Sequence, residues 1–397
     1  MSEVVNIPQL RFPEFNGEWE EKALGVVATI TTGSTPSTSN NEYYDGDVAF
    51  VSPADIQGNR IVRSTKTTIT ELGLSVVREI KKRSTLFVCI GSTIGKVSQA
   101  GVNCATNQQI NALTAKNSFD NDFIYSLLEF KAPRIKLLAG VQAVPQINKS
   151  EFSRFKFTFP LLPEQQKIAA FLTAVDNKIE QLSKKQELLG EYKKGLMQQI
   201  FSQAIRFKAD DGSEFPDWEE KNGNEIFDNI SNKNHDSDLP ILAITQEHGA
   251  IPRDLINYKM IVSDKSVSSY KVVETGDFII SLRSFQGGIE YSNYKGICSP
   301  AYIILRPAIE IEKKFYKYYL KTYRYIQDLN RKLEGIRDGK MVSYKYFSEI
   351  KLPYPSISEQ AKIANFLSSI DNKIEQVGKQ LDESKQFKKA LLQQMFV

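Results

Sequence analysis

The stretch LPEQQKIAAFLTAVDNKIEQLSKKQELLGEYKKGLMQQIF, residues 162–201, decides the fold because the chain contains it twice. The second copy, ISEQAKIANFLSSIDNKIEQVGKQLDESKQFKKALLQQMF, occupies residues 357–396. Residues 164–201 align without a gap to residues 359–396 at a constant offset of 195, and 20 of these 38 positions are identical. Chance does not produce such a match, so the chain is an internal duplication.

Both copies are predicted to form long helices, because they are rich in residues that lose little rotamer freedom in a helix. Apolar residues recur at alternating steps of four and three, the heptad spacing of a seam that faces a partner helix. The seam positions are Val175, Ile179, Leu182, Gln186, Leu189, Lys193, Leu196 and Ile200 in the first copy, and Ile370, Ile374, Val377, Leu381, Ser384, Lys388, Leu391 and Met395 in the second. A lysine at the same seam position of each copy can fix the helix register.

A helix of this length extends about 57 Å, which exceeds the diameter of a small domain. We therefore predict an antiparallel coiled-coil pair of helices that joins two heads; the alternative is two core helices within one globule. Residues expected to form the seam or to contact another subunit are Ile168, Phe171, Ile179, Leu182, Ile363, Phe366, Ile374 and Val377.

The flanks of the helices are repeated as well. Arg11-Phe12 returns as Arg206-Phe207 at the same offset, and the WEEK sequence at 19–22 returns at 218–221. The order along the chain is therefore cyclic: head, helix, head, helix. A pseudo-twofold arrangement follows, and we expect the N-terminal arm to pack near the end of the C-terminal helix.

Each head mixes predicted strands and helices, so the fold class is α+β, with two heads on a duplicated helical scaffold. In the first head we expect strands at 47–51 and 84–90 and helices at 123–130 and 133–138. In the second we expect strands at 276–282 and 301–306 and a helix at 312–333. Outside their flanks the two heads do not align. The predicted segments are an arm (1–18), the first head (19–160), the first long helix (161–203), a linker (204–217), the second head (218–355) and the second long helix (356–397).

Composition indicates an ordinary globular chain of 397 residues, with 41% hydrophobic and 25% charged residues and a formal net charge of +4. The three cysteines and two histidines have no metal-ligand spacing, so we expect idle thiols in a reducing compartment. The N-terminus does not read as a signal peptide, and no apolar run approaches membrane-spanning length. We expect a cytoplasmic location.

The sequence contains no catalytic signature that we can assign. The glycine-rich turn Gly91–Lys96 follows a predicted strand, but it has one residue too few between its glycines for a Walker loop, and Val97 stands where the hydroxyl residue belongs. There is no Pro-Pro pair of the kind found in amino-methyltransferase motifs. We therefore expect no cofactor in this chain and no enzymatic activity of its own.

Charge is segregated along the chain. Residues 60–96 carry a net charge of +6, residues 313–351 carry +7 with seven interleaved tyrosines, and residues 209–228 carry −7. One basic run in each head suits binding of a phosphate backbone. The alternative is a solvated helix face with its tyrosines in the core.

Polar turns in both heads could reach base edges, because arginine suits guanine, and asparagine or glutamine suits adenine. For any single one of these residues, the alternative is a turn residue whose side chain bonds its own backbone. The candidate DNA-contacting residues are Arg63, Lys66, Ser92, Thr93, Lys96, Gln142 and Gln146 in the first head, and Arg253, Lys259, Arg283, Ser284, Gln286, Arg337, Lys340, Ser343 and Lys345 in the second.

Taken together, the paired helix entries LPEQQKIAAFL and ISEQAKIANFL, the repeated DNKIEQ, the WEEK head starts, the GSTP turn at 33–36 and the IGSTIGKV turn resemble the specificity subunit of type I restriction–modification systems (HsdS). The resemblance covers the whole chain. One departure is Ser358, which stands where the first copy has Pro163.

The resemblance implies that each head is a target-recognition domain, which reads one half of a split sequence in double-stranded DNA. It implies that the helices set the gap and dock two modification subunits (HsdM), which carry the S-adenosylmethionine site. Two restriction subunits (HsdR), which use ATP and Mg, would join them, and no membrane is involved. The alternative function is a two-headed scaffold that binds proteins rather than DNA; a nuclease or methyltransferase in its own right is disfavoured by the missing motifs.

Overall fold

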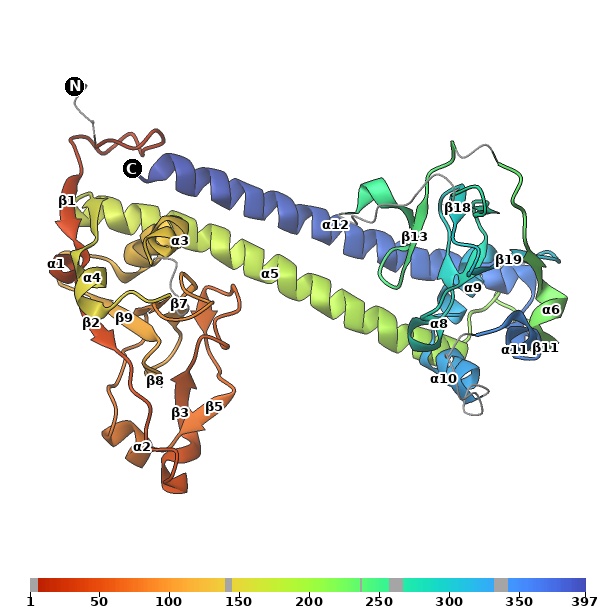
Figure 1. Cartoon of the computed structure of the whole chain (residues 1–397), viewed down its shortest axis with the longest axis horizontal. Helices are drawn as coiled ribbons and strands as arrows, with labels where there is room; N and C mark the ends of the chain where they lie inside the picture. Colours follow the sequence, from red (N-terminus) through yellow and green to blue (C-terminus); the bar gives the residue numbers. More distant parts are fainter. Residues whose placement is uncertain (1–5, 140–144, 236–237, 257–266, 332–341) are drawn as a thin grey trace. The chain divides into compact units, whose positions relative to one another are not determined.

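The two repeated stretches form the two longest helices of the chain, α5 (Leu162–Phe201) and α12 (Ile357–Met395), and each is unbroken in this computed structural model (Figure 1). The structure describes residues 6–139, 145–235, 238–256, 267–331 and 342–397. The chain divides into two units, one of residues 1–185 with 377–397 and one of residues 186–376. Both long helices therefore contribute one half to each unit.

Within each unit the two long helices run antiparallel. In the first unit Ile168 of α5 shares a core with Leu391 of α12, and the carboxylate of Asp176, further along α5, bonds Lys388, which lies earlier on α12, at 2.6 Å. In the second unit Lys193 bonds Asp371 at 2.6 Å. The offset of 195 relates one ion pair to the other. The predicted charge in the seam thus pairs with the opposite helix in both units.

Burial confirms the heptad pattern. All sixteen seam positions named above are buried or half-buried, whereas residues 183–185, 187 and 188 of α5, which face away from the seam, are exposed. A helix whose apolar stripe is covered at this spacing is stabilised by packing rather than by propensity alone.

The first head consists of short strands and helices around two sheets. A five-stranded sheet has the order β2-β9-β6-β7-β4, a three-stranded sheet has the order β5-β3-β8, and β1 pairs with β10. Its elements are β1 (Glu20–Ala23), α1 (Leu24–Val27), β2 (Ala28–Thr32), η1 (Asn41–Tyr43), β3 (Tyr44–Val51), β4 (Ile61–Val62), β5 (Thr67–Ile69), α2 (Glu71–Ser75), β6 (Thr85–Val88), β7 (Val97–Ala100), β8 (Cys104–Thr106), β9 (Ile110–Ala115), α3 (Asn121–Leu138), α4 (Lys149–Arg154) and β10 (Lys156–Phe159).

The second head has a four-stranded sheet of order β12-β19-β16-β17, the pairs β13-β14 and β15-β18, and β11 paired with β20. Its elements are β11 (Glu219–Asn222), α6 (Gly223–Ile226), β12 (Phe227–Ile230), β13 (Leu242–Thr245), β14 (Gly249–Pro252), η2 (Arg253–Leu255), β15 (Lys271–Val273), β16 (Phe278–Ile280), α8 (Ser284–Gly287), β17 (Glu290–Tyr291), β18 (Gly296–Cys298), β19 (Ile303–Pro307), α9 (Lys313–Tyr319), α10 (Tyr323–Arg331), α11 (Tyr344–Ser348) and β20 (Lys351–Tyr354).

The structure aligns the two heads where the sequence does not. The strand order β2-β9-β6-β7 of the first head corresponds to β12-β19-β16-β17 of the second, with antiparallel pairing throughout both. Helices α3 and α9 also correspond, because the backbone N–H of the N-cap residue, Asp120 or Glu312, donates to the glutamine near the start of the adjoining long helix, Gln165 or Gln360, at 3.0 Å. The duplication therefore extends into the heads, whose sequences have diverged beyond recognition.

Two helix predictions were wrong in detail. The helices expected at 123–130 and 133–138 are one helix, α3, with Pro133 inside it. Pro133 has no N–H to donate within the helix. The packing of α3, with Ile135 in the core, outweighs the loss of that hydrogen bond. Conversely, the helix expected at 312–333 is two helices, α9 and α10. The Thr322 hydroxyl accepts from the N–H of Tyr325 and so caps a new helix start.

An arginine clamp fixes the segment that leads into each head to the long helix of the same unit. Arg11 bonds the buried carboxylate of Glu164 through two nitrogens at 2.8 Å, and the indole of Trp19 donates to the same carboxylate at 3.3 Å. In the second unit Arg206 bonds Glu359, which is fully buried, at 3.1 Å. Bidentate contacts of this kind are strong and directional.

The N-terminal arm packs on the end of α12, as the cyclic order predicts. The N–H of Leu10 donates to the carbonyl of Gln394 at 2.9 Å, and in Figure 1 the arm runs past the end of α12. Where the chain is continuous after α5, the N–H of Ile205 donates to the carbonyl of Gln199 at 3.2 Å. The offset of 195 relates these two bonds. The contact between the N-terminal arm and the end of α12 therefore has the same geometry as the continuous connection after α5, which we call the joint. No helix in the described ranges is long and apolar enough to cross a membrane.

Candidate nucleic-acid interface

In the first head, one group of candidate residues lies at the edge where the glycine-rich turn meets its neighbours. The turn starts and ends at glycines with positive φ, 93° at Gly91 and 89° at Gly95, which suits glycine far better than any other residue. The N–H of Gly91 donates to the carbonyl of Pro145 at 2.9 Å, which brings the exposed Gln146 beside Ser92 and the half-buried Thr93.

The same edge includes the loop that follows β3. The ammonium of Lys96 donates to the carbonyl of Pro53 at 3.3 Å, and the carboxylate of Asp55 accepts from the N–H of Lys66 at 2.9 Å. The Lys66 side chain is exposed. Three candidates, Ser92, Gln146 and Lys66, are therefore exposed at this edge, whereas the half-buried Lys96 bonds the chain itself.

Three arginines of the first basic run are engaged in ion pairs within the chain. The Arg60 guanidinium bonds Asp176 of α5 and Asp122 of α3, both at 3.0 Å, with only 8% of its side chain exposed. Arg83 pairs with Asp122, and Arg63 bonds Glu180 of α5 at 2.6 Å. Arg60 and Arg63 attach the head to the long helix, whereas Arg83 pairs within the head. The net charge of the run therefore overstates its capacity to bind phosphate.

Lys388 completes this internal network. Its ammonium bonds Glu129 of α3 at 2.5 Å and Asp176 of α5 at 2.6 Å, and it lies over the Tyr125 ring. Burial raises the pKa of Glu129, and the charge of Lys388 counteracts that effect. Burial also acts to raise the pKa of Asp122, but hydrogen bonds and the nearby guanidinium groups lower it below its usual value.

In the second head, two candidate arginines line one cavity of about 680 Å³. Arg253 approaches from η2 and Arg283 from the turn after β16. The carbonyl of Arg283 accepts from the amide of Gln246 at 3.5 Å, which brings the end of β13 to the same cavity. Gln246 is exposed and was missed in the sequence, because a single glutamine after a strand gives no signal there.

The other described candidates of the second head are divided between surface and turn. Gln286 and Lys345 are exposed. Ser284 is 1% exposed and its hydroxyl accepts from the N–H of Ser281, so it stabilises the turn and is no longer a contact candidate. Ser343 caps α11 by accepting from the N–H of Tyr346, a local role. Gln142, Lys259, Arg337 and Lys340 lie outside the described residues.

For the tyrosines of the second basic run, the alternative interpretation was correct in the described part. Tyr316, Tyr318, Tyr319 and Tyr325 are buried in the core of the second head. Tyr323, at the start of α10, is 66% exposed, and Tyr344 and Tyr346 are half-buried. The cysteines likewise belong to the interior: burial raises the pKa of Cys89, Cys104 and Cys298 to about 12, so these thiols are unreactive at neutral pH. Within the described ranges, no cluster of acidic, histidine and cysteine side chains could hold a metal ion.

The long helices present two equivalent aromatic side chains to solvent. Tyr192 of α5 is 56% exposed and Phe387 of α12 is 53% exposed, and the offset of 195 relates them. Of the predicted contact residues, Ile168, Leu182, Ile363 and Val377 are buried, and Phe171, Ile179, Phe366 and Ile374 are half-buried against their own unit. Those eight residues therefore face the interior of their own units, whereas Tyr192 and Phe387 are exposed.

Comparisons with known proteins agree with this architecture. A family model described as the type I restriction modification DNA specificity domain matches residues 16–189 and again residues 216–384. The chain is similar to the type I restriction enzyme MjaVIII specificity subunit of Methanocaldococcus jannaschii, with 25% identity over 405 residues that cover 96% of this chain and 92% of that protein. It is also similar to the HindI specificity subunit of Haemophilus influenzae, with 29% identity over 174 residues, 41% of this chain and 37% of that protein.

Solved structures show the same fold. The crystal structure of the type I restriction–modification S subunit from M. genitalium has a TM-score of 0.62 and 19% identity, and the match covers 98% of this chain and 99% of that chain. A second match, from a study of complex assembly and conformational transition of the type I system, has a TM-score of 0.55 and 18% identity over 96% of this chain and 97% of that chain.

Proposed function

Because the chain belongs to the family of type I restriction–modification DNA specificity proteins, we propose that it is the DNA-recognition subunit of such a complex. Each head reads one half of a bipartite sequence in double-stranded DNA, and the long helices set the gap. The observation that carries the proposal is that the same framework occurs twice in the chain. Equivalent strands, equivalent arginine–glutamate clamps and equivalent helix joints support two heads whose polar surfaces differ. Such a molecule suits the recognition of two different half-sites in a fixed order.

The candidate contacts on the two heads differ in chemistry. The first head offers Gln146, Ser92 and Lys66 around a glycine-rich turn, whereas the second offers Arg253, Arg283 and Gln246 around a cavity. Arginine pairs best with guanine, and glutamine with adenine, through two hydrogen bonds in the major groove. We expect the two half-sites to differ accordingly.

We further propose that the chain acts with other subunits in the cytoplasm and is itself non-catalytic. Two modification subunits would supply S-adenosylmethionine chemistry, and restriction subunits would use ATP and Mg, as the resemblance implies. Support for two equivalent partners comes from Tyr192 and Phe387, because identical subunits would each meet an aromatic side chain at the same position of a repeated helix. Exposed aromatics are frequent anchors of protein interfaces.

The test is methylome sequencing of a methylation-free host that expresses the chain together with its modification subunit. The control host expresses the modification subunit alone. A split motif methylated on adenine in both halves, present only with this chain, is the expected result and names the target. A stable complex of the two subunits that yields no motif, and that binds DNA without steep salt dependence, would instead favour the protein-binding scaffold.

A further inference from the structure

Three amide side chains follow strand β8 of the first head, and they differ in what holds them. The amide nitrogen of Asn107 donates to the amide oxygen of Gln109 at 2.9 Å, and Gln109 donates to the carbonyl of Ile90 at 3.4 Å. Both side chains are half-buried, whereas Gln108, which lies between them in the sequence, is exposed. The two neighbours therefore fix the loop, and Gln108 faces solvent.

The amide of Gln108 is oriented by the turn at 33–36. The hydroxyl of Thr35 donates to its Oε1 atom at 2.8 Å, and the turn is held in place because the N–H of Ser34 donates to the carbonyl of Thr106 at 2.9 Å. Since the amide oxygen faces Thr35, the amide nitrogen faces away from it. The two N–H groups on that nitrogen have no acceptor among the residues that the structure describes.

Gln108 lies at the edge of the first head that also presents Ser92, Gln146 and Lys66. On one side of its loop, the N–H of Asn107 donates to the carbonyl of Val51, the last residue of β3, at 3.1 Å. On the other side, the carbonyl of Gln109 accepts from the N–H of Cys89 at 2.8 Å, just before the glycine-rich turn. The loop therefore joins the two segments that frame this edge, and a duplex placed on the edge would meet Gln108.

The framework shared by the two heads does not require a glutamine at this position. Leu113 of β9 corresponds to Leu305 of β19, because their partners on the neighbouring strands are related by the offset of 199 between the head starts. Counting back five residues gives Gln108 in the first head and Pro300 in the second. Proline has no N–H to donate. The donor thus distinguishes one head from the other, as expected of a residue that reads a half-site.

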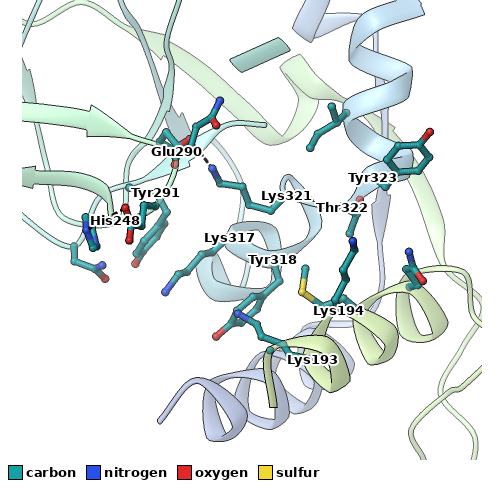
Figure 2. A pocket seen from close by; sticks show the side chains of 18 residues that line it. Lys193, Lys194, His248, Glu290, Tyr291, Lys317, Tyr318, Lys321, Thr322 and Tyr323 are labelled. Atoms are coloured by element: carbon teal, nitrogen blue, oxygen red, sulfur yellow. Dashed lines mark hydrogen bonds and ion pairs between the residues drawn. The ribbon is translucent and has the colours of Figure 1, made fainter. Parts of the chain in front are cut away.

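The polar groups of the second unit show a different arrangement. In its cavity of about 610 Å³, the ammonium of Lys321 bonds the buried carboxylate of Glu290 at 2.5 Å (Figure 2). The ammonium groups of Lys194 and Lys317 point away from each other in the same view. These lysines do not converge on one ligand atom, whereas Gln108 presents two donors on a single atom of fixed orientation.

We infer that Gln108 contacts a base edge in the half-site read by the first head and that Thr35 positions it; this inference rests on the proposed function. A glutamine that presents both its oxygen and its nitrogen suits adenine. With its oxygen turned toward Thr35, Gln108 presents donors, and guanine offers two acceptors, N7 and O6, in the major groove. The base expected at this position is therefore guanine. A phosphate contact would not require the fixed orientation, because every free phosphate oxygen accepts.

The experiment uses the full chain with its modification subunit in a methylation-free host. It compares Gln108→Ala, Thr35→Val and the double variant with the parent, and Thr35→Ser tests rescue because serine keeps the hydroxyl. The matched control is Gln57→Ala: Gln57 is an exposed glutamine of the same head whose amide nitrogen donates to the carbonyl of Ala54 at 3.0 Å. Thermal unfolding shows whether each variant is folded, and Gln108→Ala carries the test alone if Thr35→Val unfolds.

Methylome sequencing of the parent names the split motif. Fluorescence anisotropy then measures binding to a duplex with this motif and to duplexes in which single G·C pairs of one half-site are replaced by A·T. We expect Gln108→Ala to relax one G·C position of one half-site and to lower the discrimination at that position about tenfold. Thr35→Val should relax the same position and add nothing to Gln108→Ala. Thr35→Ser and Gln57→Ala should leave the motif unchanged.

An unchanged motif in Gln108→Ala would overturn the contact. Weaker binding to every duplex with the motif unchanged would also overturn it, since that is the behaviour of a phosphate contact. Relaxation at an A·T pair would overturn the assignment of donors to guanine, and additive effects of the two substitutions would overturn the role of Thr35. A parent that methylates no split motif would reject the proposed function and this contact with it, so the two failures are distinguishable.

Discussion

At the scale of single residues, the most informative contrast is between two equivalent lysines. Lys388 is buried between two carboxylates, those of Glu129 and Asp176. Lys193 is half-buried and bonds one carboxylate, that of Asp371, which also accepts from the hydroxyl of Tyr318. Removing Lys388 therefore leaves the buried carboxylate of Glu129 without a cation, although Asp176 keeps Arg60, whereas removing Lys193 leaves Asp371 with the Tyr318 hydroxyl as a donor.

We predict that Lys388→Met lowers the free energy of unfolding of the first unit by about 3–5 kcal/mol. Lys193→Met should cost the second unit about 1 kcal/mol or less. Hydrogen exchange measured peptide by peptide reports each unit separately and checks both values. Equal losses in the two units would contradict the role given to burial.

The loss in Lys388→Met should also depend on pH. Burial raises the folded-state pKa of Glu129, so this carboxyl contributes stability below its unfolded pKa that is lost as pH rises through the folded value. Without Lys388 the folded pKa rises further. The free energy of unfolding that Lys388→Met loses is therefore expected to be largest at neutral pH. The loss should shrink in mild acid, where Glu129 takes up a proton.

Base contacts are also a matter of single side chains. Arg283→Ala should relax one base position in one half-site, with about 1–3 kcal/mol of discrimination lost, and leave the other half-site intact. Gln146→Ala should do the same in the opposite half-site. Each variant is the control for the other in methylome sequencing, and a change in both half-sites from either variant would remove that residue from the contacts.

At the scale of elements, the sequence predicted the long helices and the four head strands expected at 47–51, 84–90, 276–282 and 301–306, but it did not reveal how the two heads correspond, for a physical reason. The helix seam repeats a local spacing that any window of the sequence reveals. The match between β6 and β16 depends on long-range strand pairing and leaves almost no local trace. Arg60 is the sharpest case: in sequence it belongs to a basic run, and only the packing of the head on α5 reveals it as an internal ion-pair partner.

The helices should act as a ruler. Inserting four residues after Gln186 and four after Leu381 lengthens the pair by about 6 Å, or roughly two base pairs. We expect the gap of the methylated motif to grow with both half-sites unchanged. An insertion in α5 alone is the control, because it puts the two seams out of register and should destabilise the protein. Altered half-sites in the paired insertion would reject the ruler.

The exposed aromatics of the helices should anchor the partner subunits. Tyr192→Ala and Phe387→Ala are each expected to release one modification subunit, since a hot-spot aromatic contributes about 2 kcal/mol or more. The mass of the complex, measured by light scattering, gives the number of subunits bound. Leu188→Ala, at an exposed position of α5 without an aromatic equivalent on α12, is the control. Unchanged mass in both aromatic variants would place the docking surface elsewhere.

At the scale of the whole molecule, the cyclic order predicted from Arg11-Phe12 and Arg206-Phe207 is confirmed by the joint at the termini. The hydrogen bond between Leu10 and Gln394 repeats the one between Ile205 and Gln199. The offset of 195 places Pro8 at the position of Gln203, and it places Val397 at the position of the residue before Gln203. Val397 and Pro8 therefore correspond to two consecutive residues of the joint after α5.

A circular permutant should therefore fold. We propose to join Val397 directly to Pro8 and to open the chain in the exposed turn at residues 210–213. Thermal unfolding and the methylated motif are both expected to match the parent, because the new joint copies an existing one. A permutant that opens the chain inside β6 is the control and should not fold. Loss of the motif in a folded permutant would show that recognition requires a break in the chain between Val397 and Pro8.

The paired strands at the base of each head have a consequence for heredity. Glu20 lies opposite Phe159 in the first head, and Glu219 lies opposite Tyr354 in the second. The first and last strands of each head are therefore paired side by side. A gene segment that encodes one head can therefore be exchanged for another without disturbing the helices, and the repeated helix sequences offer crossover points on both sides. A lineage would acquire new targets by recombining whole heads, and a small stock of heads would multiply into many pairs.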